Sequence, residues 1–117
     1  TPGPSASPAP AAECGGVTSL NMGTFDDDYT LQAGGTDSVK LVVSFYQNVL
    51  ELPAICTDPL TPNFTATGTG GCAIRGPISE GGIRAWVVTA ANVGTCSITA
   101  KLPAIPPSNA VDLTVEP

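Results

Sequence analysis

Four cysteines, Cys14, Cys56, Cys72 and Cys96, are spread along this chain, and they constrain its fold more than any other feature. Structural zinc sites usually supply cysteines as C-x-x-C pairs, and the chain has no such spacing. The cysteines therefore predict two disulfides, which are typical of secreted and cell-surface proteins. The sequence leaves their pairing open. The short loop between Cys56 and Cys72 favours a bridge there, with Cys14 then joined to Cys96.

The composition predicts a single all-β domain. The chain has 117 residues, enough for one two-layer core. Hydrophobic residues make up 42% but aromatic residues only 5%, so the core must consist mainly of Val, Ile, Leu and Ala, a palette that favours strands. The few large side chains are Trp86, Phe25, Phe45, Phe64, Tyr29 and Tyr46.

The first 13 residues have a different composition, rich in Pro, Ala and Ser. Such a segment buries little apolar surface and favours extended polyproline II, so we expect an arm or linker at 1–13 and a folded domain at 14–117. Thr1, Ser5 and Ser7 are candidates for O-glycosylation. The segment is either a stalk or an arm that docks on a neighbouring copy. Because the chain opens at Thr1 without an apolar leader, we expect that an export signal has been removed.

Short β-rich runs separated by glycine turns fill the rest of the chain. They predict an antiparallel, immunoglobulin-like β-sandwich of seven or eight strands with two disulfides. The expected strands are 17–20, 38–46, 49–56 with an interruption at Pro53, 63–67, 72–75, 83–90, 96–102 and 110–115. The proline cluster at 102–109 predicts a loop, because consecutive prolines cannot supply ladder hydrogen bonds. The glycine-rich stretch at 68–71 lacks the Lys-Ser/Thr ending of a phosphate-binding loop and predicts a flexible loop.

Alternation of apolar and polar residues is clearest in two consecutive strands. Trp86, Val88 and Ala90 share one face of the first strand and are expected to point inward. In the next strand we expect the inward set Cys96, Ile98, Ala100 and Leu102 and the outward set Ser97, Thr99 and Lys101. Trp86 is therefore expected to be a core anchor rather than a platform for a ligand.

The block at 86–100, W-V-V-T-A-A-N-V-G-T-C-S-I-T-A, resembles the last strands of immunoglobulin-like or fibronectin-III-like modules in bacterial surface proteins. Together with the terminal run A-V-D-L-T-V-E-P, it is also similar to the macroglobulin-type domains of the α2-macroglobulin and complement family. The chain departs from that family in its Pro-rich arm and in lacking a thioester motif. The resemblance implies a sandwich fold used for interaction or architecture more than for catalysis.

The absence of histidine removes several classes of catalysis. A Ser-His-Asp or Cys-His arrangement is impossible, and so is a zinc site with a histidine ligand. The acidic candidates for a carboxylate pair show no spacing that marks two facing acids; they are Asp26, Asp27, Asp28, Asp37, Glu51, Asp58 and Glu80. We therefore predict that the chain is not an enzyme and needs no cofactor.

Charge argues against nucleic acid as a partner. The net charge is −6, and the four basic residues, Lys40, Arg75, Arg84 and Lys101, are scattered. No apolar run is long enough to span a membrane. The run 26–28 contains three aspartates that offer oxygen ligands for calcium, but adjacent side chains in an extended strand cannot all face one ion. A solvated acidic turn that also discourages edge-to-edge pairing is the favoured interpretation, and no metal site is predicted.

Two functions fit these observations. The first is a non-catalytic extracellular structural or adhesive module, such as a filament or surface-array subunit whose arm adds as a strand to the next copy. The alternative is a carbohydrate- or protein-recognition domain using the loops 57–71 and 76–82, with Phe64 and Arg75 as candidate contacts. The partners are then other copies or neighbouring domains of a larger surface protein, or such a ligand. The triplet Asn63-Phe64-Thr65 is a sequon for N-glycosylation.

Overall fold

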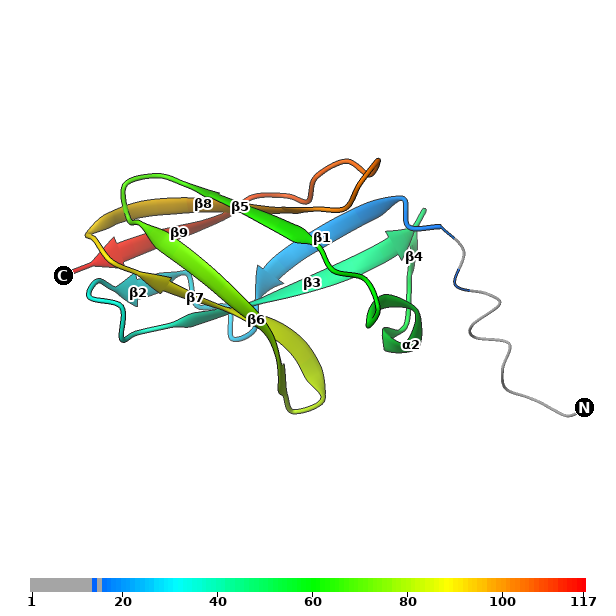
Figure 1. Ribbon diagram of the computed structural model, residues 1–117, viewed down its shortest axis with the longest axis horizontal. Helices are drawn as coiled ribbons and strands as arrows, with labels where there is room; N and C mark the ends of the chain where they lie inside the picture. The colour runs from blue at the N-terminus through cyan, green and yellow to red at the C-terminus, as the bar shows by residue number, and fades with distance from the viewer. Residues whose placement is uncertain (1–13, 15) are drawn as a thin grey trace, which may run out of the picture.

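In the computed structural model, residues 14 and 16–117 are described, and they form two β-sheets packed around one core (Figure 1). Sheet A has the order β1-β3-β7-β6, with β4 also paired to β3. Its strands are β1 (Ser19–Thr24), β3 (Val39–Gln47), β4 (Leu50–Glu51), β6 (Cys72–Glu80) and β7 (Ile83–Ala90). Sheet B has the order β2-β9-β8-β5 and contains β2 (Thr30–Gln32), β5 (Asn63–Thr67), β8 (Gly94–Lys101) and β9 (Val111–Glu116).

The predicted β character is confirmed, with two differences in strand number and direction. The described residues form nine strands, not seven or eight. The extra strand β2 pairs in parallel with β9, with Leu31 opposite Val115, whereas only antiparallel pairs were expected. β2 has three residues, too few to produce an alternating pattern, and its position beside β9 is set by tertiary contacts.

A strand over 49–56, interrupted at Pro53, was expected, and the part after Pro53 is wrong. β4 covers only Leu50–Glu51 and is followed by the one-turn helix α2 (Ala54–Thr57). Pro53, directly before the helix, has no N–H for a ladder hydrogen bond, but its carbonyl oxygen accepts hydrogen bonds from the N–H groups of Cys56 and Thr57. The proline therefore ends the strand and starts the helical turn.

The predicted inward set of β7 and the predicted alternation of β8 are confirmed. Trp86 is 4% exposed and Val88 is 0% exposed, so the tryptophan is a core residue. In β8 the side chains of Cys96, Ile98 and Ala100 are also buried. β7 is buried on its other face as well, at Ala85 and Val87, which were not expected to be inside. The core combines side chains of both sheets, including Leu20, Leu41, Phe45, Leu31, Leu113 and Val115.

The two disulfides are present, but their pairing differs from the one that loop length favoured. The bonds join Cys14 to Cys56 and Cys72 to Cys96. β5 runs extended between Cys56 and Cys72 and carries them apart, although a disulfide needs Cα atoms within about 7 Å. Cys72 begins β6 in sheet A and Cys96 lies in β8 of sheet B, so their bond ties the two sheets together.

The glycine-rich stretch at 68–71 is not the loosely packed loop that its composition predicts. The N–H of Gly70 donates to the carbonyl oxygen of Thr95. A Cβ atom at Gly70 would lie 2.8 Å from Sγ of Cys96, and one at Gly68 would clash with the carbonyl of Thr95. The glycines are required here because the chain passes directly against β8.

Candidate functional site

A groove opens beside the sheets where β3 and β7 part. β7 pairs with β3 only at 39–41, and β4 pairs with β3 only at 46–47. Residues 42–44 of β3 therefore face no strand on that side. β6 has an irregularity between Arg75 and Ile78, where the Gly76–Pro77 peptide is cis, and the β6–β7 hairpin diverges from β3 beyond it (Figure 1).

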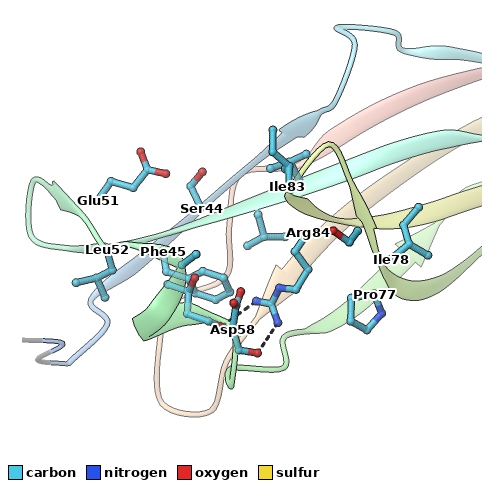
Figure 2. A pocket seen from close by; sticks show the side chains of 15 residues that line it. Ser44, Phe45, Glu51, Leu52, Asp58, Pro77, Ile78, Ile83 and Arg84 are labelled. Carbon is cyan, nitrogen blue, oxygen red and sulfur yellow. Dashed lines mark hydrogen bonds between the residues drawn. The ribbon is translucent and has the colours of Figure 1, made fainter. Parts of the chain in front are cut away.

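The groove has an apolar floor and an aliphatic rim. Figure 2 shows side chains from β3, β4, the α2 region and the β6–β7 hairpin around a cavity of about 480 Å³. Phe45 and Leu52 are buried at its floor. Ile78 and Ile83, on the hairpin, are 36% and 45% exposed. Such partly exposed aliphatic side chains favour a ligand that buries apolar surface.

Among the described residues, Arg84 is the one basic residue that lines the groove, and its guanidinium is bonded to other groups of the protein. Its guanidinium donates hydrogen bonds of 2.9 Å to the carbonyl oxygens of Thr57, Asp58 and Leu60. The same group stacks over the ring of Trp86, 4.8 Å from its centroid. Figure 2 shows the guanidinium directed at the segment that follows α2. Arg84 thus fixes this segment to β7 and is already engaged by main-chain oxygens.

The charges at the mouth of the groove are acidic. Glu51 and Asp58 line it and have no salt bridge within the described part of the chain. Lys40 lies 3.6 Å from Glu80, its partner in the one ion pair found there. Carboxylates beside aliphatic side chains suit a segment that carries a basic group next to apolar residues.

The main chain of β3 also contributes to the groove. The carbonyl oxygens of Lys40 and Tyr46 accept hydrogen bonds on the β1 side, from Phe25 and Thr18. Because successive residues of a strand alternate in direction, the N–H and C=O of Val43 point the other way, toward the groove. The groove can therefore hold an extended peptide by apolar contact and main-chain hydrogen bonds.

The structure brings together the two segments that the sequence suggested as ligand loops. Thr57 and Asp58 of 57–71 lie opposite the hairpin residues of 76–82, of which Pro77, Ile78, Ser79 and Gly82 line the groove. Neither segment is simply a loop. The first contains β5, and the second contains the end of β6, which continues to Glu80 instead of ending near 75 as expected.

The two individual contact candidates, Phe64 and Arg75, lie outside this groove. Phe64 is partly buried in β5, and its ring centroid lies 5.2 Å from that of Trp86. Arg75 is exposed on β6. A ligand contact by either residue stays a prediction. Leu52 and Ile83 were not expected to contact a ligand. The Gly76-Pro77 pair within β6 was the sequence signal for the divergence of the hairpin.

The candidate modification sites are placed in part. Asn63 is exposed at the start of β5, so its side-chain amide is accessible. Thr1, Ser5 and Ser7 lie outside the described residues. The run 26–28 forms an exposed turn, as predicted. Among the described residues there is no group of three or more potential metal-ligating side chains and no helix long and apolar enough to span a membrane.

No family model matches this chain. The resemblance of 86–100 and of the C-terminal run to immunoglobulin-like modules therefore stays a prediction.

Proposed function

We propose that the chain is a non-catalytic extracellular structural or adhesive module with an immunoglobulin-like sandwich, linked to neighbouring copies or domains through its N-terminal arm. The observation that carries this proposal is the disulfide between Cys14 and Cys56. This bond joins the residue directly after the arm to α2. A force on the arm therefore reaches α2 directly as well as along the main chain to β1. Two disulfides are typical of extracellular proteins.

The position of this attachment supports a linking role. α2 lies at one end of the sheets, and β9 ends at the opposite end (Figure 1). Aliphatic side chains are exposed on the neighbouring elements, with Val49 96%, Leu50 63% and Ile55 63% exposed. Exposed apolar residues beside an arm favour contact with another protein surface.

Deleting residues 1–13 tests the linking role. We expect the full chain to assemble with rising concentration in analytical ultracentrifugation and to form regular particles in negative-stain micrographs. The truncated chain should stay monomeric with an unchanged melting temperature. A matched control replaces each proline of the arm by serine and keeps its length. Assembly of the truncated chain equal to that of the full chain would contradict the proposal.

The groove favours a second function, recognition of an extended peptide. Its supporting observation is that segments 57–71 and 76–82 meet across an apolar cavity next to Val43, whose main chain pairs with neither β4 nor β7. A carbohydrate would be expected to use an exposed aromatic platform, but Phe45, the one aromatic residue among the described residues that line the groove, is 1% exposed.

A peptide array probes this second function. We expect the chain to retain extended peptides in which a lysine or arginine is flanked by valine or isoleucine. Ile83→Asp should abolish that binding, because it places a carboxylate on the aliphatic rim of the groove. The matched control is Val93→Asp, at an exposed aliphatic residue outside the groove. Equal binding by both variants would exclude the groove.

A further inference from the structure

The lateral edges of the two sheets differ in how their outward main-chain groups are satisfied. The outward main chain of Met22 in β1 is capped by the side chain of Asn109. The Asn109 side chain accepts a hydrogen bond from the N–H of Met22 and donates one to the carbonyl oxygen of Met22, each 2.8 Å long. The outward N–H groups of β2 are held by Asp28 and Asp37. The irregularity at Gly76–Pro77 interrupts β6. Outward groups of Leu20 in β1 and Ile74 in β6 also have no partner within the described part of the chain, but β5 is the edge there with neither a side-chain cap nor an interruption.

The direction of the β5 main chain follows from its neighbour β8. Ala100 accepts a hydrogen bond from the N–H of Ser108 and donates its own N–H to the hydroxyl of that residue, on the β9 side. Thr99 and its partner Thr65 must then bond to each other, since directions alternate along a strand. Phe64 and Ala66 therefore direct their N–H and C=O groups outward, and no hydrogen bond to them is found among residues 14 and 16–117.

The prolines of the arm show a matching pattern. All four, Pro2, Pro4, Pro8 and Pro10, stand at even positions. In an extended strand even and odd residues point to opposite sides, so every missing N–H falls on one side. The odd residues from Gly3 to Ala9 keep complete N–H and C=O groups on the other side. Such a segment can add to a sheet edge and cannot accept a further strand beyond itself.

We propose that the arm of one copy adds as a terminal strand to the outer edge of β5 of a second copy. The inference rests on the proposed linking function and assigns its acceptor edge. The odd residues would bond to Phe64 and Ala66 and share their inward-facing side of the sheet. The odd side chains between the prolines, Gly3, Ser5, Ser7 and Ala9, are all small, as needed beside the partly buried Phe64.

Placement of the arm's attachment favours a second copy as the acceptor. Cys14 is bonded to Cys56 of α2, and α2 with residues 58–62 lies between that bond and the start of β5. Figure 1 shows α2 at the end of the molecule, beyond β5. The arm is about 40 Å long when extended. If it paired with β5 of the same copy, part of that length would be needed to span the distance past α2. A neighbour placed at that end can use all of it.

A proline scan of the full chain tests the alternation directly. Ser7→Pro removes an N–H from the bonding side and should raise the dissociation constant of assembly about tenfold. The matched control Ala6→Pro places a proline on the side where the others stand, and should change the constant less than about twofold. Both substitutions lie outside the folded domain, so the melting temperature should be unchanged. Sedimentation equilibrium measures the constants.

Amide hydrogen exchange of the assembled full chain locates the acceptor edge. We expect the amides of Phe64 and Ala66 to exchange about tenfold more slowly on assembly, and those of Thr30 and Gln32 in β2 to be unaffected. Ser7→Pro should abolish the protection. Arm-dependent assembly with protection elsewhere, or with equal effects of both proline variants, would overturn the β5 assignment and leave the linking function intact.

Two further results would show which of the two proposals, the linking function or the pairing with β5 of a second copy, is wrong. Protection of Phe64 and Ala66 in a monomer would show that the arm caps its own edge, which overturns the intermolecular assignment. Absence of both assembly and protection would overturn the linking function and the acceptor edge together.

Discussion

The two edges of sheet B end in opposite ways. At β2 the outward N–H of Thr30 lies 3.1 Å from Asp28 Oδ1, and that of Gln32 lies 2.8 Å from Asp37 Oδ2. At β5 the outward groups of Phe64 and Ala66 have no partner in the described part of the chain. An edge with free main-chain groups is a template for another strand, whereas an edge capped by carboxylates is not.

The difference shows that edge protection in this protein is local and selective. The caps of β2 come from aspartates within five residues of the groups they hold. β5 contains no charged residue and four of its five residues are exposed. Because the outward N–H groups of β2 are held by carboxylates and those of β5 have no partner among residues 14 and 16–117, addition of a strand is expected at the β5 side of sheet B. The following experiments test that contrast.

The largest change in stability is expected from loss of the disulfide between Cys72 and Cys96, which holds β8, the neighbour of β5. Cys72→Ala with Cys96→Ala removes the bond between β6 and β8 and should lower the free energy of unfolding by about 3 kcal/mol. Amides of β5 and β6 should then exchange faster than those of β2. The control, Cys14→Ala with Cys56→Ala, should accelerate exchange around α2 instead. Unchanged exchange in β5 would contradict this view of the β5 side.

The next effect concerns the side chain that anchors β5. Phe64 is partly buried against Trp86, so Phe64→Ala should lower the free energy of unfolding by about 2–3 kcal/mol in urea denaturation. If Phe64 served only to contact a ligand and did not pack in the domain, the substitution would leave the free energy of unfolding unchanged. Thr67→Ala, at an exposed position of the same strand, is the control and should change it by less than about 0.5 kcal/mol.

Proline substitutions in β5 test which groups point outward. Thr65→Pro removes an N–H from the ladder to β8 and should destabilise the chain by about 2 kcal/mol. Ala66→Pro removes an outward N–H and should cost about 1 kcal/mol or less, mainly from backbone strain. Thermal unfolding of both variants measures the difference. The reverse order of stability would show that the edge faces the other way.

The smallest effect is expected at the capped edge. Asp37 accepts hydrogen bonds from the N–H groups of Gln32 and Ser38, and Asp37→Ala should lower stability by about 1 kcal/mol. It should also make β2 prone to pairing, seen as self-association that does not need residues 1–13. Asp112→Ala, at an exposed residue of β9, is the control for lost charge. Equal effects of the two variants would mean that charge alone protects the edge.

Several elements of the fold were predictable because their signals are local. Trp86, Val88 and Ala90 lie two residues apart along one strand, and this period of two placed them inside correctly. The same period did not predict that Ala85 and Val87, on the other face, are buried too. β2 was not predicted, because a strand of three residues is too short to show an alternation of apolar and polar side chains. The strand expected at 49–56 failed after Pro53, because this residue has no N–H and turns the chain into α2.

The sequence suggested the two segments that form the candidate site, but not that they lie together in the structure. Both 57–71 and 76–82 contribute to the groove, but nothing local indicates that they lie opposite each other. Their meeting depends on the divergence of the β6–β7 hairpin and on the hydrogen bonds of Arg84 to the segment after α2. Arg84 was noted in the sequence only as one of four scattered basic residues.

By itself the sequence determined the β character, the inward face of β7, the alternation of β8, the lack of histidine chemistry and the even positions of the four prolines of the arm. Each depends on residue identity or on neighbours along the chain. Tertiary structure alone decided that Cys14 pairs with Cys56 and Cys72 with Cys96, that Asn109 and Asp37 cap their edges, and that β5 is left open. Those outcomes depend on which strands lie side by side, and strand order is a property of long-range packing.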